Sequence, residues 1–392
     1  MTRRYNVKDF GADGTDKKSD YDAIQEALDQ ASEDHMTVVI VPNGTYYIDG
    51  TLYIQSNTTL KLSSHATIKR KKSALANNML RTTNARHFSG FTGGYRLAHN
   101  ITVTGGTWDG GDIAKAKKTS NLIYMGHSKH ITIKNTTIKH CYGAHAIEFA
   151  GVKDSTIKNC KISEFRYDSS RFTSEAIQLD TCYKSKKDGR WTPGFKADKT
   201  PCTNILIEKN TITDYPRGIG VHHYLKDHLI TNITIRDNRF KRSSASTQGK
   251  SVVGIFLMGV TKATITQNTF DHYAYGAMVK LSKKVSITKN NFKYNPSGNL
   301  IVEGCDKNNG RHTFRVTSDD INTTKFEFTC GNISSGTVKT GGRTYYFHKK
   351  GTNTITLSDN LYANQQVDFY GKDDYNNKYY RTYYVPRQTV RK

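Results

Sequence analysis

Short runs in which hydrophobic and polar residues alternate recur along most of the chain. The clearest run has the form Ile-Thr-Ile-x-x-Asn-x-Phe, with a β-branched aliphatic residue at its third position. That position is filled in turn by Val103, Ile133, Ile157, Ile207, Ile235, Ile265 and Ile287. Successive repeats are therefore 30, 24, 50, 28, 30 and 22 residues apart. Alternating strands that repeat at such intervals are typical of a β-solenoid.

One asparagine position recurs within these runs, and it indicates a turn that is stacked from coil to coil. Its members are Asn210, Asn238, Asn268 and Asn290. Identical amides at one turn of successive coils can hydrogen-bond to each other along the solenoid. We therefore expect an asparagine ladder with a structural role.

A second strand precedes each of these runs, and its spacing locates an insertion. In three coils the strand isoleucine lies 10 residues before the third position of the run, whereas Ile177 lies 30 residues before Ile207. About 20 extra residues therefore follow Asp180, the last residue of the strand Ser174–Asp180. An insertion of this length at one coil indicates a functional loop beside that strand.

The first 70 residues contain a helix pattern and several short strand patterns. Residues 19–32 predict a helix, and the runs that follow it alternate as strands. The segments Asp9–Gly14, Asp22–Gln25 and Val41–Tyr46 resemble the N-terminal signature of the pectate lyase and polygalacturonase superfamily and of related phage tailspikes. This resemblance implies a right-handed parallel β-helix whose first coil is plugged by the 19–32 helix.

The predicted fold is therefore all-β. It comprises a right-handed parallel β-helix over residues 1–312, with its N-terminal capping helix, and a small C-terminal β appendage over residues 313–392. The repeat stops near residue 312, and the remaining sequence is rich in Thr, Tyr, Asn, Lys and Gly. The appendage is expected either to cap the open end of the solenoid or to bind a wall polymer.

The resemblance implies a substrate class, polysaccharide, but transfers no catalytic residue. The paired aspartates and the Gly-His-Gly and Arg-Ile-Lys motifs of polygalacturonases are missing from the coils, since Asp319-Asp320 lies beyond the solenoid. The aspartate cluster with which pectate lyases bind calcium is also missing from the sequence. We therefore predict no metal and no cofactor.

The net charge of the chain limits the kinds of partner that it is expected to bind. The chain carries 58 Lys and Arg against 34 Asp and Glu, a net charge of +24, which favours an anionic polymer. No nucleic-acid motif and no apolar run long enough for a membrane span occurs in the sequence. The chain begins without a signal-peptide pattern. We expect a secreted or cell-surface protein whose signal is absent from this chain, or a phage particle component; no oligomeric state is predicted.

Stacking the second strands in register gives two outward columns, and these supply the catalytic candidates. In that alignment Asp180 lies against His222, and Glu148 lies diagonally across from Asp180, with Cα atoms roughly 8 Å apart from the strand spacings. The small residues Gly126, Ala150 and Gly220 are expected to leave room for a ligand. The first column reads Tyr124, Glu148, Gln178, Gly220, Phe256 and Lys280, and the second reads Gly126, Ala150, Asp180, His222, Met258 and Ser282.

Two carboxylates at this separation suit glycosidic cleavage, in which one protonates the leaving oxygen and the other activates water or attacks. We therefore predict Glu148 and Asp180 as catalytic residues, with Glu175 as a further catalytic candidate. His222 is expected either to orient Asp180 or to bind sugar. The alternative is that both carboxylates are solvated ladder positions that pair with lysines.

Substrate contacts are expected from residues around this strand. The candidates are His145, His223, Gln178, Trp191, Arg217 and Lys280. Trp191 lies in the insertion 181–203 together with Phe195 and several lysines, and this loop can form a wall that stacks on sugar faces. Trp108 occupies a core position of the repeat and is predicted to be packing. Cys182 and Cys202 bracket the insertion, either as a disulfide or as free thiols.

The leading function predicted from the sequence is polysaccharide depolymerisation, by a glycoside hydrolase that acts on an acidic or bacterial surface polysaccharide. A lyase that acts on a uronate-containing polymer is the first alternative. A non-catalytic glycan-binding, wall-binding or phage adhesion protein is the second alternative.

Overall fold

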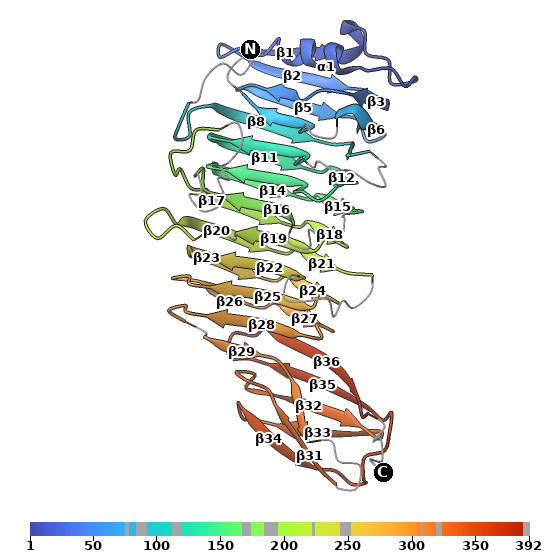
Figure 1. Cartoon of the computed structure of the whole chain (residues 1–392), viewed down its shortest axis with the longest axis vertical. Helices are drawn as coiled ribbons and strands as arrows, with labels where there is room; N and C mark the ends of the chain where they lie inside the picture. Colours follow the sequence, from blue (N-terminus) through green and yellow to red (C-terminus); the bar gives the residue numbers. More distant parts are fainter. Residues whose placement is uncertain are drawn as a thin grey trace.

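The protein forms a long solenoid that continues at one end into a smaller group of strands (Figure 1). The computed structural model describes residues 1–74, 78–83, 92–111, 120–166, 174–183, 195–221, 224–243, 252–307, 309–318 and 324–386. Within these ranges each coil contributes one strand to each of three sheets, and neighbouring solenoid strands are parallel. The predicted parallel β-helix is confirmed.

The first sheet contains the strands of the Ile-Thr-Ile runs. Its strands are β1 (Thr2–Asn6), β2 (Met36–Val41), β5 (Thr58–Leu62), β8 (Ala98–Thr104), β11 (Ser128–Lys134), β14 (Lys153–Lys158), β17 (Thr203–Glu208), β20 (Ile230–Arg236), β23 (Val260–Thr266) and β26 (Ser286–Thr288). The aliphatic third positions of the repeat lie opposite one another from β8 to β26, as the spacing predicts.

The second sheet contains the strands that precede those runs. Its strands are β4 (Leu52–Ile54), β7 (Leu80–Thr82), β10 (Ile123–Gly126), β13 (Ile147–Ala150), β16 (Glu175–Asp180), β19 (Arg217–Val221), β22 (Val253–Met258), β25 (Tyr275–Lys280), β28 (Gly298–Glu303) and β29 (Gly310–His312). All neighbours are parallel except β29, which turns back antiparallel to β28 and ends the sheet.

The third sheet begins with the short strands that complete each coil. These are β3 (Gly44–Ile48), β6 (Ala66–Arg70), β9 (Thr107–Asp109), β12 (Thr137–Lys139), β15 (Lys161–Ser163), β18 (Thr211–Thr213), β21 (Arg239–Lys241), β24 (Thr269–Asp271) and β27 (Asn291–Lys293). The sheet then continues through β36 (Lys378–Tyr384), β35 (Gln366–Lys372), β32 (Ser335–Thr340) and β33 (Arg343–Phe347).

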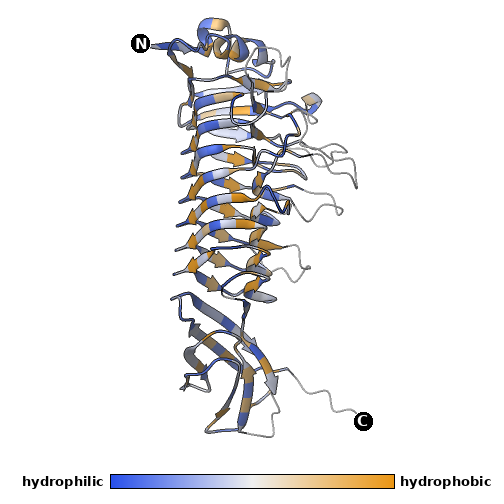
Figure 2. Ribbon diagram, turned by 90° about the vertical axis from the view of Figure 1, so that its left-hand side faces the viewer, coloured by the Kyte–Doolittle hydropathy of each residue, from blue (hydrophilic) through white to orange (hydrophobic). Residues whose placement is uncertain are grey.

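The core is a continuous column of aliphatic and aromatic side chains inside the three sheets. Figure 2 shows hydrophobic and hydrophilic residues alternating along the solenoid strands. Trp108 lies between Ile68 and Ile138 of the neighbouring coils and is fully buried, so its predicted packing role is confirmed. Each apolar side chain that leaves water here contributes about 1.5–3 kcal/mol to folding.

The asparagine ladder is present and is longer than the repeat predicts. Successive amides donate from Nδ2 to the next Oδ1 over 3.0 Å, from Asn210 through Asn238, Asn268 and Asn290 to Asn377. A stack of rings runs beside it through Phe240, Phe270, Phe292 and Tyr379, with centroids 4.9, 4.7 and 5.2 Å apart. Both ladders therefore cross from the last solenoid coil into the C-terminal strands.

The N-terminal cap consists of η1 (Val7–Phe10) and α1 (Tyr21–Leu28), and η2 (Lys72–Ala74) follows β6. The predicted helix over 19–32 is shorter than expected at both ends. It starts later because Asp20 is the N-cap residue, and its carboxylate accepts hydrogen bonds from the backbone N–H groups of Asp13 and Tyr47. It ends earlier because the chain turns at Asp29, and Ala31 N–H donates to Leu28 O over 3.1 Å.

Residues after 312 form β strands, as the sequence predicts. A small antiparallel sheet of β30 (Arg315–Ser318), β31 (Lys325–Thr329) and β34 (Thr352–Thr356) lies beside the end of the third sheet. Because β36 pairs in parallel with β27, these strands extend the solenoid directly. The division into domains at 312 stays a prediction. In the described ranges, no helix has the length and apolar character needed to cross a bilayer.

Candidate active site on the second sheet

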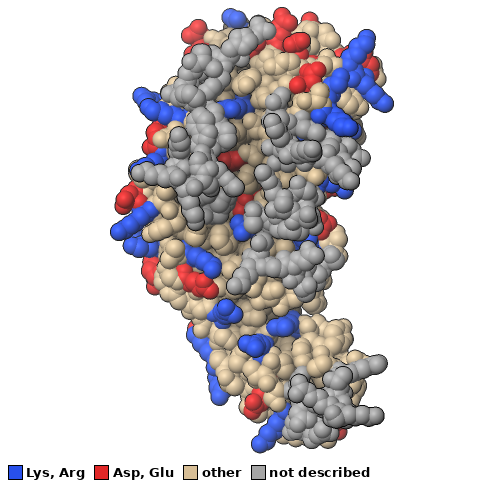
Figure 3. Space-filling view, viewed as in Figure 1, with Lys and Arg blue, Asp and Glu red and all other residues tan. Residues whose placement is uncertain are grey.

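The carboxylates predicted to act in catalysis lie on the outward side of the second sheet, near the middle of the solenoid. Glu148 is on β13, and Glu175 and Asp180 are at the two ends of β16, the neighbouring strand. Figure 3 shows acidic atoms (red) with a basic side chain (blue) beside them near the centre of the upper half of the molecule. Parallel strands 4.8 Å apart hold such side chains on a rigid floor.

Register fixes which residues neighbour Glu148. Tyr124 of β10 lies opposite Glu148 on one side, and Gln178 of β16 lies opposite it on the other. Ala150 lies opposite Asp180, so Asp180 is one strand over and two residues further along than Glu148. The predicted diagonal arrangement of Glu148 and Asp180 is therefore present.

Glu148 is a buried carboxyl with one polar anchor. Only 6 % of its surface is exposed, and its Oε2 accepts a hydrogen bond from the side-chain amide of Asn121. The pKa of Glu148 lies well above its usual value, mainly because the carboxyl is buried and secondly because of the negative charge of Asp180. The hydrogen bond from Asn121 lowers this pKa, and the more weakly acting charge of Glu175 raises it. This environment favours the protonated form of the carboxyl, the form that can donate a proton.

Asp180 is the more solvated of the two carboxylates. It is half-buried at the end of β16, where its Oδ1 accepts a hydrogen bond of 3.0 Å from the backbone N–H of Thr181. The pair therefore combines a buried acid with a more exposed carboxylate, an arrangement that suits two different roles in one reaction.

Glu175 is fully buried and is held by two basic neighbours. Arg217 of β19 lies opposite it in register and donates from NH1 to Oε1 over 2.9 Å. His145 approaches from the other side, with Nδ1 3.4 Å from Oε2. Because its charge is paired within the protein, Glu175 fits a positioning role better than the catalytic role predicted for it. Arg217 and His145, predicted to contact substrate, contact Glu175 in this structure.

Two polar atoms beside Glu148 lack hydrogen-bond partners. Gln178 is fully buried and donates to Leu179 O over 3.2 Å, but its Oε1 finds no donor in the described part of the chain. The same holds for the hydroxyl of Tyr124 on the opposite side of Glu148. Buried polar atoms without partners are rare in proteins. These two therefore flank Glu148 with hydrogen-bonding capacity that water or a ligand hydroxyl would satisfy.

The space predicted above two of the small residues is occupied. A side-chain carbon added at Gly126 would lie 2.4 Å from the ring of Phe195, and one at Gly220 would lie 2.3 Å from Glu175 Cγ. Phe195 is 1 % exposed and packs on the Tyr124 ring, so it is part of the structure and not the expected sugar-facing wall. The glycines let neighbouring side chains close over the floor; the prediction that they leave room for a ligand was wrong.

Lys280 is displaced from the column in which the sequence alignment put it. Phe256 lies opposite Met278, and Lys280 lies opposite Met258, in the column of Asp180. It pairs with Glu303 of the next coil, with 2.8 Å between Nζ and Oε2. The alignment was wrong by two residues because β25 has no isoleucine at the position used to align the strands. Ala277 lies opposite Ile255 there. Ser282 lies beyond the strand.

Three predicted site residues lie outside the described part of the chain: His222, His223 and Trp191. The pairing of His222 with Asp180 and the stacking role of Trp191 therefore stay predictions. The sequence reasoning missed Asn121 and Tyr124. Asn121 was detectable in principle, because it precedes Ile123 by the same two residues that separate His145 from Ile147.

The cysteines that bracket the insertion are free thiols. Cys182 and Cys202 are both buried, and burial raises the pKa of Cys202 to about 12 and that of Cys182 also upward. Thiols with such raised pKa values are inert at neutral pH. They pack beside Asp180, whose backbone carbonyl accepts from Cys202 Sγ over 3.3 Å.

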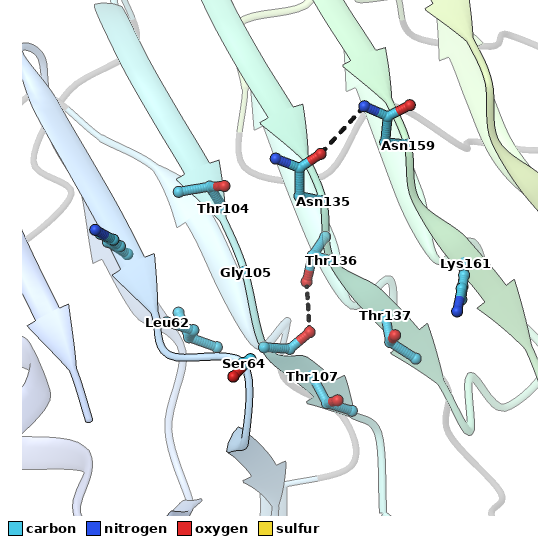
Figure 4. Close-up of a pocket in the computed structure, with 12 residues that line it drawn as sticks. Leu62, Ser64, Thr104, Gly105, Thr107, Asn135, Thr136, Thr137, Asn159 and Lys161 are labelled. Atoms are coloured by element: carbon cyan, nitrogen blue, oxygen red, sulfur yellow. Dashed lines mark hydrogen bonds between the residues drawn. The ribbon is translucent and has the colours of Figure 1, made fainter. Parts of the chain in front are cut away.

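A separate cavity on the opposite side of the solenoid is lined without carboxylate or imidazole side chains. It measures about 470 Å³ and lies where the first sheet turns into the third (Figure 4). Its lining includes Asn135, Thr136 and Asn159, and Asn159 donates to Asn135 over 3.2 Å. No Asp, Glu or His is among its lining residues. The second-sheet carboxylates therefore remain the better candidates for chemistry.

Across the described ranges, no group of three or more His, Cys, Asp or Glu side chains is arranged to hold a metal ion.

Two regions of the chain match known sequence families. Residues 4–107 match the family described as rhamnogalacturonase A/epimerase, pectate lyase-like. Residues 113–250 match the family described as right-handed β-helix region, and this second match covers the coils that carry Glu148, Glu175 and Asp180.

Among curated proteins, the chain is similar to plasmin and fibronectin-binding protein A of Streptococcus pneumoniae. The two are 26 % identical over 326 residues, which is 76 % of this chain and 43 % of that protein. The chain thus spans less than half the length of this relative.

Two solved structures illustrate the shared fold. The crystal structure of PfbA, a surface adhesin of S. pneumoniae, superposes with a TM-score of 0.61 at 22 % identity over 77 % of each chain. A hyperthermoactive exopolygalacturonase from Thermotoga maritima superposes with a TM-score of 0.54 at 14 % identity, over 77 % of this chain and 75 % of that one. At these identities the likeness concerns the fold. With the two family matches, it shows that the chain is a right-handed β-helix protein with a pectate lyase-like N-terminal region.

Proposed function

We propose that the protein is a polysaccharide depolymerase of the glycoside hydrolase type, with Glu148 as the general acid and Asp180 as the base or nucleophile. The observation that carries this proposal is the burial of the Glu148 carboxyl, which raises its pKa, one strand away from the more solvated Asp180. Glycosidic cleavage needs such a pair, because the leaving oxygen must be protonated while a second carboxylate assists attack.

The surrounding residues support this division of roles. Asn121 fixes one oxygen of Glu148, and Glu175 adds negative charge that raises the pKa of Glu148. Arg217 and His145 hold Glu175 in place, so we assign all three as positioning residues. The unsatisfied Gln178 Oε1 and Tyr124 hydroxyl are suited to sugar hydroxyls on either side of the acid.

We propose an anionic polysaccharide as the substrate. The net charge of +24 raises the local concentration of such a polymer. A cavity of about 330 Å³ beside the N-terminal cap adds a local cluster of positive charge, because Lys17, Lys69, Lys71 and Lys72 line it. We propose a secreted or cell-surface location for the same reason, since such polymers occur outside the cell.

The experiment is a screen of the full chain against anionic and neutral polysaccharides. New reducing ends without ultraviolet absorption at the product terminus identify a hydrolase, whereas an absorbing unsaturated sugar identifies a lyase. The matched control is Glu208→Gln, which removes a buried carboxylate of the first sheet that pairs with Arg236. Product formation that persists in Glu148→Gln and Asp180→Asn would overturn the assignment.

A second candidate function is adhesion without catalysis. The observation that favours it is the similarity, over 76 % of this chain, to a protein described as binding plasmin and fibronectin. Immobilised plasmin and fibronectin, added to the same screen, separate the two candidates. Binding to either protein without product from any polymer would select adhesion.

A further inference from the structure

The third sheet continues beyond the solenoid through the C-terminal strands. Its order there is β27, β36, β35, β32 and β33, and Figure 1 shows these strands following one another below the last coil. The burial pattern alternates along β35: Val367 and Phe369 are buried, and Gln366 and Lys372 are exposed. One side of these strands therefore faces the core, and the other faces solvent.

The solvent side carries a row of tyrosines at one register position. Tyr380 of β36 lies opposite Tyr370 of β35, Tyr370 lies opposite Thr337 of β32, and Thr337 lies opposite Tyr346 of β33. We call Tyr346, Tyr370 and Tyr380 the tyrosine row. From the strand spacing, the row extends over roughly 14 Å.

The rings of the row are available for contact. Tyr346 is 69 % exposed, and Tyr370 and Tyr380 are half-buried against each other with centroids 4.9 Å apart. Tyr384, further along β36 on the same side, is 60 % exposed. None of these rings is needed to fill the core, which lies on the other side of the sheet. Solvent-accessible aromatic rings gathered on one face, here interrupted only by Thr337 between Tyr346 and Tyr370, are typical of an interaction site.

Positive charge surrounds the row. Lys293 lies opposite Tyr380 on β27, and Lys378, Lys372 and Lys339 occupy other outward positions of β36, β35 and β32. Within the ranges that the structure describes, none of these four lysines has an ion-pair partner. Asp368 is the one acidic residue at the outward positions of β36, β35, β32 and β33, and its carboxylate accepts from Thr382 and Gln366. The surface is thus aromatic and cationic at once.

We propose that the tyrosine row and its lysines form a docking surface for an anionic polysaccharide. The apolar C–H faces of sugar rings stack on tyrosine rings, while the tyrosine hydroxyls and the lysine amines meet hydroxyl and acidic groups. A linear row of rings fits an extended chain better than a compact ligand. The surface lies on a different sheet from Glu148 and Asp180, so this inference does not depend on the proposed catalytic function.

The test measures binding of the full chain to polygalacturonate and to neutral dextran by affinity electrophoresis at low and high salt. The Glu148→Gln background is used throughout, so that cleavage cannot remove the probe. Tyr346→Ala is the main variant, because its ring is largely exposed and its removal leaves the core intact. Tyr362→Ala is the matched control, since Tyr362 is 62 % exposed in the same region but lies outside these strands.

We expect Tyr346→Ala to weaken binding to polygalacturonate by about 3- to 10-fold, as the loss of one aromatic contact does, and Tyr362→Ala to leave it unchanged. Lys339→Gln should weaken binding less, and mainly at low salt. Dextran should be retarded far less than polygalacturonate. Tyr370→Phe and Tyr380→Phe should keep most of the binding, because stacking needs the ring more than the hydroxyl.

Either of two results would overturn the proposal. One is equal binding of polygalacturonate by Tyr346→Ala and Tyr362→Ala. That result is also expected if the natural ligand of this face is a protein. The other is equal retardation by dextran and polygalacturonate, which would remove the role of the lysines. Loss of cleavage in Glu148→Gln with binding intact separates this surface from the proposed active site, and failure at one leaves the other standing.

Discussion

Two ladders run through neighbouring coils of the solenoid, and they differ in kind. The asparagine ladder repeats one side chain, is fully buried, and hydrogen-bonds to itself from Asn210 to Asn377. The outward ladder of the second sheet changes at every coil, from Tyr124 to Glu148 and then to Gln178 and Gly220. One is a stack of equivalent units, whereas the other juxtaposes different chemical groups.

The difference follows from what each ladder must satisfy. A buried turn offers the same unpaired backbone groups at every coil, so one residue type solves the problem repeatedly. An outward strand position carries no such obligation, because it can face solvent. A buried and changing set of side chains on that face, as around Glu148, costs stability without serving the coil, because the Gln178 Oε1 and the Tyr124 hydroxyl find no hydrogen-bond partner in the described ranges. Such a set is expected at a functional site, and it supports the catalytic role proposed for Glu148.

The largest expected effect comes from the outward ladder. Glu148→Gln and Asp180→Asn should each lower turnover by ~10²–10⁴-fold, because each removes a group that donates or accepts a proton in the transition state. Thermal unfolding should stay cooperative in both variants, since neither side chain fills the core. The measurement is the initial rate of reducing-end release at saturating substrate. Wild-type rates in both would move the chemistry away from this ladder.

The same residue predicts a pH dependence. Burial and the charges of Asp180 and Glu175 raise the folded-state pKa of Glu148 above its unfolded value of about 4.3. Between these two pKa values the folded state holds more protons than the unfolded state, so the free energy of unfolding falls as pH rises until it passes the folded pKa. Activity that needs the protonated acid should decline on the same alkaline side.

Glu148→Gln provides the measurement for this pH dependence. The amide does not titrate, so its unfolding free energy should lack this decline, and the wild type should lose stability relative to the variant as pH rises. Urea unfolding at several pH values measures the difference. A gap between wild type and variant that stays constant with pH would mean that the Glu148 pKa is ordinary in the folded protein.

The asparagine ladder should respond in the opposite way, with a loss of stability and no loss of catalysis. Asn268→Ala removes a buried amide that accepts from Asn238 and donates to Asn290 and to Ile235 O. Because it leaves buried backbone and side-chain groups without partners, we expect it to lower the free energy of unfolding by about 1–3 kcal/mol. Turnover per folded molecule should be unchanged. A larger effect on turnover than on stability would erase the distinction between the two ladders.

The contrast also explains how much of this structure the sequence predicts. The first sheet is predictable because its sequence repeats. The paired positions from Val103 to Ile287 all lie in register, as the spacing predicts. The same logic locates Glu148 and Asp180, because each lies at a fixed offset from a strand isoleucine. Asn377 was not predicted as a member of the asparagine ladder, because it belongs to a segment that lacks the repeat.

What the sequence does not predict are the contacts between coils that no repeat specifies. Phe195 covers Gly126, and Glu175 covers Gly220, because side chains from inserted or neighbouring segments fill the space that a glycine leaves. The pairing of Glu175 with Arg217 joins residues 42 positions apart. Such contacts depend on side-chain packing in three dimensions, and they cannot be deduced from the position of each residue in its own strand.

The smallest expected effect concerns Lys280, the residue that the column alignment misplaced. It lies in the column of Asp180 but three strands away, and it pairs with Glu303 at a site where the two side chains are 31 % and 48 % exposed. Lys280→Gln should therefore change the free energy of unfolding by only about 0–1 kcal/mol, as exposed ion pairs do. Its effect on the Michaelis constant is the sharper test. If the amine contacts an acidic sugar group, the Michaelis constant rises at low salt while turnover is kept, because such a contact serves the ground state and the transition state alike. An unchanged Michaelis constant at low salt would confine the substrate to the coils from β10 to β19.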